Sequence, residues 1–516
     1  MPLRPIALGD VRAIGHGVKR PEDVVVSRDN RVWASDQASA CAEILPDGGL
    51  RRVGNAGGAP NGINMDALGR ILIANFGMGS AASGPLQRLD PETGQIEVLC
   101  DAIDGRTIVA SNYPIVDRAG NVWVSHSTWD REKSAQGLAD GFVYRVRPDG
   151  RAEKMAEGFS FTNGLALDAD ERYLYVCQSI GRNVVRLPIR ADGSLGAIES
   201  YGPVLGEPAF ARATQAQRLT FGATDGCGFD ADGNLWVTLV VAGRIVAITP
   251  DRRVVPVLED TAGATMVWPT NVSWGGPDMR DLYIGSVRKD YVLHARSPVP
   301  GLPLAHQRWG AGVVASWDSV AAEYAQHYFD ELDGKPFDRA RLDDFATAMK
   351  GRGRVADLGC GPGHIGRYLA ARGVATIGID LSPSMVATAR RLNPGLEFRE
   401  GDFFRLDLPD GALAGVAAFY SLIHCARNEL TRALKEIHRV LEPGGRLLLA
   451  LHAGSGEVGR EEAWGKRVAL VATLFSESEV RTALEAAGFR VDALTERPPY
   501  EHEYQSRRLY ALASRG

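Results

Sequence analysis

The chain has 516 residues, which is too long for one ordinary domain, so two or three domains are expected. Its composition, 45% hydrophobic and 23% charged, is that of a globular protein. The net charge of −5, with no long basic run, argues against a nucleic-acid partner. The sequence shows no apolar run long enough to span a membrane, no signal-peptide pattern and no C-x-x-C pair among its six cysteines. A cytoplasmic protein without a membrane partner is therefore expected, and its oligomeric state stays open.

One pattern occurs six times in the first 300 residues or so. Its copies begin at Pro21, Pro60, Ser111, Thr162, Thr224 and Pro269. Each reads as a hairpin: a β-rich run, a turn rich in Asp, Asn or Gly, and an alternating strand such as 234–238. Further short strands lie between the copies, and four strands per roughly 40–60 residues are typical of a propeller blade. The pattern predicts an all-β six-bladed propeller.

Alignment of the copies exposes one position just before each predicted inner strand. It holds Glu22, Asn61, Asn112, Asn163, Asp225 and Thr270. Inner strands of a propeller line a central channel, so these side chains are expected to form a ring. Turn capping would explain Asn61 and Thr270, but two converging carboxylates repel each other unless a cation or a proton lies between them. An oxygen-only set suits a divalent cation, Ca²⁺ first; a metal-free polar channel is the alternative.

Several blades resemble the SMP-30/gluconolactonase/LRE family of six-bladed propellers. The resemblance covers about residues 10–305 and rests on NG-x-x-x-D at Asn163, DG-x-x-x-D-x-x-GNLWV at Asp225 and TNVSWGGPDMRDLYIGS at Thr270. It implies that Glu22, Asn163 and Asp225 bind the metal and that Asn112 lies near the substrate. The metal would act as a Lewis acid on a lactone or ester carbonyl, with Asp225 also a candidate base for water.

The third blade departs from that family. Sugar lactonases carry Arg-x-Asn-Asp where this chain has Ala110-Ser-Asn-Tyr113, so a less polar pocket is expected and gluconolactone is a doubtful substrate. His126 ends the second strand of this blade and either reaches the same mouth to meet substrate or is a structural histidine.

The segment 297–316 is rich in Pro and Gly and is expected to contain the last edge of the propeller and a short linker. The predicted domains are therefore 1–309 and 317–516, joined by a linker over 310–316.

The second unit reads as alternating helices and strands. Ser316 is the expected N-cap of helical pattern that continues to about Lys350. Residues 354–366 read as a buried strand, a glycine turn and a helix, and a second strand, 375–380, ends in an acid about 20 residues further on. The alternation continues to residue 451 and predicts an α/β doubly wound, Rossmann-like sheet.

The motifs of this unit resemble those of a class I S-adenosylmethionine (SAM)-dependent methyltransferase over residues 317–516. The motifs are DLGCGPG from Asp357, GD at 401–402, FYSLIHC from Phe419 and RVLEPGGRLLLALH from Arg439. An NAD enzyme, the structural rival, would lack the downstream GD and EPGG. The resemblance implies SAM as the cofactor. It would be held by Asp357, Gly359, Gly361 and Gly363, with Asp380 on the ribose and Asp402 and Phe403 at the adenine.

The methyl acceptor is less defined by the sequence. His424 and His452 follow the ends of the fourth and fifth strands, where ligands lie in such sheets, and each is either a general base or a pocket or capping residue. The aromatic residues Tyr420, Trp464 and Tyr500 are candidates to line the pocket. The pair Arg507–Arg508 either meets an acidic acceptor or forms a solvated face.

Three functions follow from these patterns. The first is a bifunctional enzyme, of the kind expected in specialised metabolism, with lactone or ester hydrolysis in the propeller and methyl transfer in the second domain. The second is a methyltransferase whose propeller only binds substrate or a partner. The third, strictosidine-synthase-like bond formation in the propeller, fits poorly with a complete set of Glu22, Asn163 and Asp225.

Overall fold

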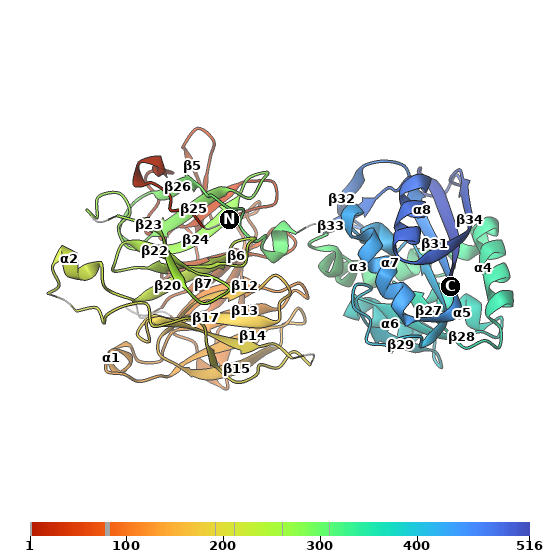
Figure 1. The fold of residues 1–516 in the computed structure, drawn as a ribbon, viewed down its shortest axis with the longest axis horizontal. Coiled ribbons are helices and arrows are strands. Elements are labelled where there is room, and N and C mark those ends of the chain that lie inside the picture. Colours follow the sequence, from red (N-terminus) through yellow and green to blue (C-terminus); the bar gives the residue numbers. More distant parts are fainter. Residues whose placement is uncertain (1–2, 78–82, 191, 211, 261, 309) are drawn as a thin grey trace. The chain divides into compact units, whose positions relative to one another are not determined.

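The computed structural model describes residues 3–77, 83–190, 192–210, 212–260, 262–308 and 310–516. The chain forms two compact units, Met1–Arg308 and Trp309–Gly516 (Figure 1). All six cysteines are buried and unpaired. Among the helices of the described residues, none is both long and apolar enough to cross a membrane.

The first unit is a six-bladed β-propeller, as the repeats predict. Five blades are four-stranded antiparallel sheets formed by consecutive strands. They are β2–β5 (Val24–Val26, Val32–Ser35, Cys41–Ile44, Leu50–Val53), β6–β9 (Pro60–Met65, Ile71–Asn75, Leu86–Leu89, Ile96–Cys100), β12–β15 (Ser111–Val116, Val122–His126, Gly141–Val146, Ala152–Phe159), β16–β19 (Thr162–Leu167, Tyr173–Gln178, Asn183–Pro188, Glu199–Ser200) and β20–β23 (Thr224–Phe229, Leu235–Leu239, Arg244–Ile248, Val254–Glu259). A small hairpin, β10 (Ala102–Ile103) and β11 (Arg106–Thr107), and two short helices, α1 (Arg131–Ala135) and α2 (Gln215–Arg218), lie between strands.

The sixth blade joins the two ends of the propeller. Strands β24 (Pro269–Gly275), β25 (Asp281–Ser286) and β26 (Val292–Arg296) are completed by β1 (Arg12–Ile14), in the register Arg12 opposite His294. The expectation that residues 297–316 hold the last edge is therefore wrong, because the N-terminal strand already occupies the edge of β26. Residues after β26 instead cross the ends of inner strands, where the Gln307 side chain donates to the carbonyls of Val26 and Trp274.

The inner strands are bulged at the ring position. The pairing register shifts in β6, β12, β16, β20 and β24 within the first four residues of each strand. Asn61, Asn112, Asn163, Asp225 and Thr270 are therefore the second residues of these strands, and only Glu22 precedes its strand, so the predicted position is shifted by about two residues. A bulge turns a side chain out of the regular alternation, which is how these strands present polar groups at their entry.

The second unit is a seven-stranded mixed sheet in the order β29-β28-β27-β30-β31-β35-β34. The parallel strands are β27 (Arg354–Leu358), β28 (Ala375–Asp380), β29 (Glu397–Glu400), β30 (Leu413–Phe419) and β31 (Leu441–Ala453), and β35 (Arg507–Arg515) runs antiparallel to both β31 and β34 (Phe489–Arg497). The helices are α3 (Val313–Tyr328), α4 (Pro336–Met349), α5 (His364–Ala370), α6 (Pro383–Leu392), α7 (Leu430–Val440) and α8 (Glu477–Ala486).

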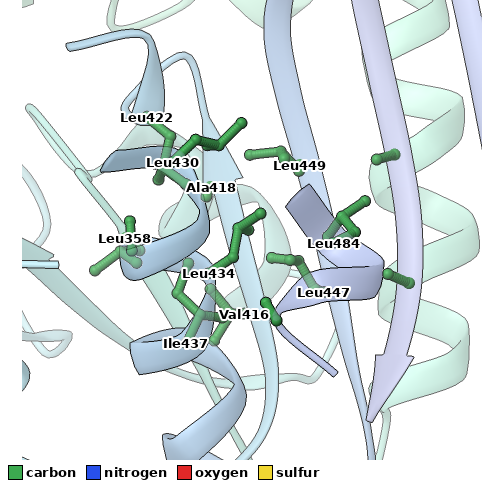
Figure 2. Close-up of a cluster of buried hydrophobic side chains, with 14 of the residues drawn as sticks. Leu358, Val416, Ala418, Leu422, Leu430, Leu434, Ile437, Leu447, Leu449 and Leu484 are labelled. Atoms are coloured by element: carbon green, nitrogen blue, oxygen red, sulfur yellow. The ribbon is translucent and has the colours of Figure 1, made fainter. Parts of the chain in front are cut away.

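Helices cover both faces of this sheet, which confirms the doubly wound prediction. Val416 and Leu447 pack with Leu434 of α7 in one core cluster (Figure 2). Their chain neighbours Ala417 and Leu448 belong to a second cluster that contains residues of α4 and α5. Successive strand residues point to opposite faces, so the two clusters lie on the two sides of the sheet.

The entry of the second unit differs from the prediction. Helix α3 begins at Val313 after Gly312, so Ser316 is not an N-cap but lies inside the helix. Its hydroxyl accepts a hydrogen bond from the Ala469 amide, 2.7 Å away. Ala469 belongs to the hairpin β32 (Glu457–Ala463) and β33 (Lys466–Thr473), a non-local partner that sequence reasoning could not supply.

Candidate active sites

The predicted ring brings two buried carboxylates together. Glu22 and Asp225 are 6% and 8% exposed. Burial raises the pKa of Glu22 well above its usual range, and the nearby charge of Asp225 raises it further. Burial likewise raises the pKa of Asp225 to about 7, against a hydrogen bond from Asn163. The Oε2 atom of Glu22 is buried and has no hydrogen-bond partner among the described residues.

These residues fit a divalent cation. Two carboxylates and the Asn163 amide are hard oxygen donors of the kind that Ca²⁺ prefers. Among the described residues no group of three His, Cys, Asp or Glu side chains could hold a metal, so any site here depends on the amide. Asn112 lies on the same ring, with its amide nitrogen 3.0 Å from the Ser127 hydroxyl.

Glycine follows the ring residue in three blades because the inner strands approach each other closely there. A Cβ on Gly226 would overlap the side chain of Asn271 and the carbonyl of Thr270. A Cβ on Gly164 would likewise overlap the backbone of Asp225 in the next blade. The Asn-Gly and Asp-Gly pairs of the repeat therefore reflect packing at the channel.

Two charged residues beside the ring were missed by the sequence interpretation. Arg20 has a positive φ of 55° and donates to the Asn61 side-chain oxygen at 2.7 Å, and its charge lowers the pKa values of Glu22 and Asp225. Asp23 accepts hydrogen bonds from the Ile63 amide at 2.7 Å and from Asn271 at 2.5 Å, and burial raises its pKa to about 7.

The alignment of the repeats holds a signal for Asp23. The position after the ring is Gly in blades 2, 4 and 5 but is Asp23, Tyr113 and Asn271 in blades 1, 3 and 6. Tyr113 is buried and contributes with the inner strands to a small cavity of about 40 Å³ that Leu302 and Leu304 also line. The third-blade departure therefore places an aromatic ring inside the propeller.

His126 lies in an aromatic cluster. It is fully buried, and its ring centroid is 4.3 Å from those of both Phe142 and Trp129. Burial lowers its pKa to about 3. Both ring nitrogens lack a hydrogen-bond partner among the described residues, so the predicted substrate contact would require this cluster to open.

The glycine turn of the second unit has the geometry that the motif predicts. Gly359, Gly361 and Gly363 all have positive φ, of 69°, 51° and 83°, between β27 and α5. A Cβ on Gly359 would overlap Ser421 at the end of β30. Side chains at these positions would strain the turn and fill the space next to it, so the glycines let a ligand approach the backbone closely.

The predicted cofactor residues meet at the carboxyl ends of neighbouring parallel strands. Asp357 lies one residue before the end of β27 and accepts a hydrogen bond from the Gly366 amide at 2.8 Å. Burial raises the pKa of Asp357 to about 6. Asp380 at the end of β28 accepts from the Gly361 amide at 2.8 Å. Asp402 follows β29 and accepts from the Phe404 amide at 2.8 Å, with Phe403 beside it. Switch-point edges of this kind bind nucleotides in doubly wound sheets.

The predicted acceptor residues lie along the same edge. His424 follows β30, and its Nδ1 is 2.6 Å from the carbonyl of Val471, so this nitrogen is the donor. His452 lies inside β31, one residue before its end, rather than after it. Tyr420 has a positive φ of 54°, and its hydroxyl donates to Asp338 at 3.2 Å. Trp464 packs near Tyr324 and His327, and the Tyr500 hydroxyl accepts from the Phe337 amide.

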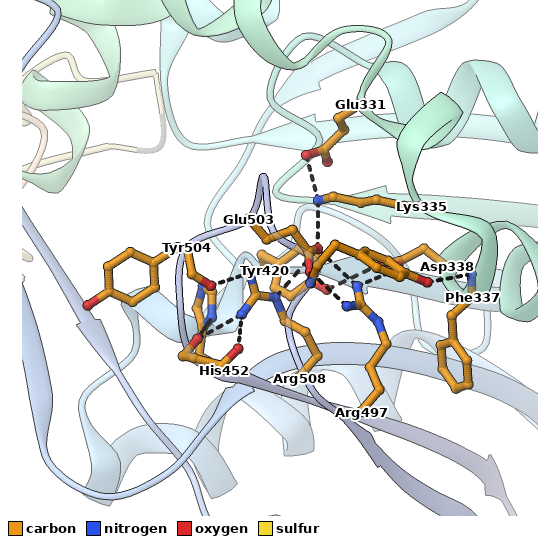
Figure 3. Close-up of polar contacts among 12 residues, drawn as sticks. Glu331, Lys335, Phe337, Asp338, Tyr420, His452, Arg497, Glu503, Tyr504 and Arg508 are labelled. Atoms are coloured by element: carbon orange, nitrogen blue, oxygen red, sulfur yellow. Dashed lines mark hydrogen bonds and ion pairs between the residues drawn. The ribbon is translucent and has the colours of Figure 1, made fainter.

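A buried network of charged side chains surrounds Tyr420 and His452 (Figure 3). Arg497 binds Glu503 at 2.7 Å and Asp338 at 2.8 Å, and Lys335 binds Glu331 at 2.7 Å. These partners come from α4, the segment before it and the β34–β35 connection. The sequence gives no periodic signal for such contacts, so this network was missed.

The two arginines of the Arg507–Arg508 pair have different environments. Arg507 is exposed and pairs with Glu496 at 2.7 Å. Arg508 is 3% exposed and faces the network. Consecutive residues of a strand point to opposite faces, so one arginine is solvated while the other is buried.

Comparison with known proteins agrees with both halves of the structure. The sequence profile of the SMP-30/Gluconolactonase/LRE-like region matches residues 76–288, and the profile of a methyltransferase domain matches residues 355–445. The chain joins an SMP-30/gluconolactonase/LRE-like propeller to a class I methyltransferase. In the methyltransferase unit, the chain is 35% identical over 196 residues to a trans-aconitate 2-methyltransferase from Methylobacterium nodulans, covering 35% of this chain and 71% of the relative.

Other relatives match one unit each. A 6-deoxy-6-sulfogluconolactonase from Pseudomonas putida is 31% identical over 175 residues, or 34% of this chain and 53% of the relative. A malonyl-[acyl-carrier protein] O-methyltransferase from Serratia marcescens is 34% identical over 149 residues, or 28% of this chain and 55% of the relative. The chain thus spans about half the length of these two relatives. The SMP-30-like and methyltransferase families agree with the predicted resemblances.

Proposed function

We propose that the protein is a bifunctional enzyme of small-molecule metabolism. Its C-terminal unit transfers the methyl group of SAM, and its propeller hydrolyses a lactone or ester with a divalent metal, Ca²⁺ first. The observation that carries the proposal is the conjunction, on one chain, of a glycine turn with three positive-φ glycines and a ring with two buried carboxylates whose pKa values are raised. The unpaired buried cysteines support a reducing compartment, and hence the cytoplasm.

Residues of the second unit fit SAM. When bound, SAM supplies an electrophilic methyl group. Gly359, Gly361 and Gly363 would leave room for its methionine part, Asp380 would accept from the ribose hydroxyls, and Asp402 with Phe403 would flank the adenine. Tyr324 of α3 lies 3.7 Å from the Cβ position of Gly361 and covers the turn.

Calorimetry with SAM tests this site. Gly361→Arg should abolish binding because the new side chain enters the ligand space. Gly395→Arg is the matched control, since Gly395 also has a positive φ, of 95°, but open space around its Cβ position. Failure of the unmodified protein to bind SAM would sink the methyltransferase proposal.

Residues of the propeller fit a metal-assisted hydrolase. Glu22, Asn163 and Asp225 would hold the cation, which would polarise a carbonyl oxygen. A carboxylate of the pair can orient or deprotonate water, since burial and its neighbour hold its pKa well above that of an exposed acid. Metal analysis before and after chelation, with a lactone and aryl-ester panel in the presence and absence of Ca²⁺, tests this half.

A non-catalytic propeller is the second candidate. It is favoured by Tyr113, which occupies channel space where sugar lactonases of the family carry an acid. Under this alternative, Asp225→Ala leaves methyl transfer to the true acceptor intact, and the protein is silent across the lactone and ester panel.

A further inference from the structure

Hydrogen bonds around His452 define which ring nitrogen carries its proton. The Nδ1 atom lies 2.7 Å from the Ser506 hydroxyl, and this hydroxyl also accepts from Nη1 of Arg508 at 2.8 Å. A guanidinium group only donates. If His452 donated as well, the buried Ser506 hydroxyl proton would have no acceptor within the described residues. Ser506 therefore donates to Nδ1, and the neutral imidazole carries its proton on Nε2.

His452 is therefore a hydrogen-bond donor through Nε2. Burial lowers its pKa to about 3, and the nearby charges of Arg508 and Lys335 contribute to the shift. The ring is neutral near pH 7 and a weak base. His424 has the opposite tautomer, because its Nδ1 donates to the Val471 carbonyl, which leaves Nε2 as an acceptor.

Two cations lie beside the Tyr420 ring, which neighbours the ring of His452, and Glu331 and Glu503 balance part of their charge. The guanidinium carbon of Arg508 lies 5.6 Å from the ring centroid of Tyr420, and Nζ of Lys335 lies 5.3 Å from the same centroid. The nearest carboxylate of Arg508 is Glu503, at 3.8 Å. The Nε–H group of Arg508 is buried and has no hydrogen-bond partner within the described residues. An unpaired buried donor on a cation costs free energy unless an anion compensates it.

This cluster lies next to the proposed cofactor site. The ring centroids of His452 and Tyr420 are 5.4 Å apart, and Tyr420 precedes Ser421, which a Cβ on Gly359 would overlap. On the other side, Lys335 binds Glu331, which binds His364 of the first turn of α5 at 3.0 Å. Figure 3 shows the part of this cluster that extends from Glu331 to His452.

We propose that the methyl acceptor is a carboxylate, held by the Nε2–H of His452 beside the cations Arg508 and Lys335. The inference rests on the proposed methyl transfer and names the substrate class of that site. A carboxylate oxygen attacks the methyl carbon of SAM, the new C–O bond gives a methyl ester, and the C–S electron pair returns to sulfur. No proton moves, so no general base is needed. The rival is a hydroxyl acceptor, deprotonated by the free Nε2 of His424.

Product chemistry separates the two acceptor classes. The full-length protein is incubated with methyl-tritiated SAM and succinate or benzoate, with succinamide, benzamide and catechol as uncharged counterparts. Mild alkali releases volatile methanol from an ester but not from an ether. We expect label in the two carboxylates alone, all of it alkali-labile.

Label in catechol that resists alkali would overturn the proposal. It would also be overturned by a protein that binds SAM but neither methylates the carboxylates nor, when saturated with S-adenosylhomocysteine, binds them in calorimetry. Absence of SAM binding would instead refute the proposed methyl transfer.

Variants of His452 test its role as a donor. His452→Gln keeps an N–H donor and should change KM for the carboxylate only a few-fold, whereas His452→Phe should raise KM about 10- to 100-fold. Both should keep the affinity for SAM, which controls for folding. Equal losses of kcat in both variants, with KM unchanged, would show a general base and contradict the proposal.

The neighbouring arginines give a matched pair. Arg508→Gln should raise KM for the carboxylate at least 10-fold, since it removes the adjacent charge. Arg507→Gln, on the exposed face of the same strand, should leave KM unchanged. A loss of equal size in the two variants would contradict a specific anion site.

Discussion

In the ring of the propeller, the two carboxylates Glu22 and Asp225 repel each other. Glu22 and Asp225 are buried, raise each other's energy when ionised, and share only the partial compensation of Arg20. A cation bound between them would relieve this repulsion, so the same side chains that destabilise the metal-free ring should stabilise the metal-bound one.

Replacing Asp225 by Asn should therefore have opposite effects in the two states. In chelator, the melting temperature of the propeller should rise by about 2–4 °C, equivalent to roughly 1 kcal/mol, because one buried charge is removed. The further rise that Ca²⁺ gives the unmodified protein should vanish. Thermal unfolding with chelator and with Ca²⁺ measures both effects, and Asp232→Asn, at an exposed turn of the same blade, is the control. A Ca²⁺-dependent shift that survives in Asp225→Asn would contradict the assignment.

At the scale of elements, helix α7 is held to the sheet by a continuous apolar face. Leu434 is fully buried among strand residues of the large core cluster, whereas the next residue, Lys435, is exposed (Figure 2). Leu434→Ala should lower the free energy of unfolding of the second unit by about 2–5 kcal/mol, through lost burial and the cavity it leaves. Lys435→Ala should change it by less than about 0.5 kcal/mol. Urea unfolding compares the two, and similar values would mean that the helix does not pack as described.

The connection between β34 and β35 is held by ion pairs whose strength depends on pH. Burial acts to raise the pKa of Glu503, but hydrogen bonds from Arg497 and the Tyr500 amide, with the charges of Arg508 and Lys335, lower it to about 2. A carboxylate whose pKa is lower in the folded state stabilises the fold above its unfolded pKa of about 4.5. That stability is lost as pH falls from about 4.5 towards 2.

Glu503→Gln should consequently be less stable than the unmodified protein at pH 7, with a smaller loss between pH 4.5 and 2. Thermal unfolding of the second unit across that range measures the difference. Glu501→Gln, in the same connection but exposed, should follow the unmodified curve. Parallel curves for Glu503→Gln and the unmodified protein would show that the ion pairs do not carry this pH dependence.

Local elements were largely predictable, and their partners were not. The six repeats predicted the blades because each repeat contains its own turn and alternation, and the DLGCGPG motif predicted the strand, turn and helix around it. The start of α3 and the last propeller edge were wrong because Ser316 binds Ala469 and β1 binds β26, both remote in sequence. The network of Lys335, Asp338 and Arg497 with Glu503 joins residues 335–338 to residues 497–503, which are remote in sequence, so no residue spacing predicts it.

The whole molecule consists of two compact units, each with its own hydrophobic clusters. A ligand that binds only a folded unit stabilises that unit by an amount set by its concentration, about 2.7 kcal/mol at 100 times Kd. In calorimetric unfolding, Ca²⁺ should therefore raise one transition and SAM another. Asp225→Asn should remove only the first response and Gly361→Arg only the second. A single transition that moves with either ligand would show that the units unfold together.

The two proposed reactions share a functional group. Hydrolysis of a lactone yields a carboxylate and a hydroxyl, and a carboxylate is the acceptor proposed for the second unit. The sequence could not predict that the acceptor is a carboxylate. That inference depends on the contacts of the Ser506 hydroxyl and the buried Arg508, and no motif encodes them.

Closure of the last blade by β1 has a consequence during synthesis. Arg12 must find His294, 282 residues later. At about 5–20 residues per second, the ribosome needs roughly 14–56 s to make that stretch. For that time the nascent blades form an open array whose terminal sheet edges are unpaired, and such edges invite pairing with other chains. The protein is therefore most vulnerable to aggregation just before β26 (Val292–Arg296) emerges, and dependence on chaperones should concentrate in that interval.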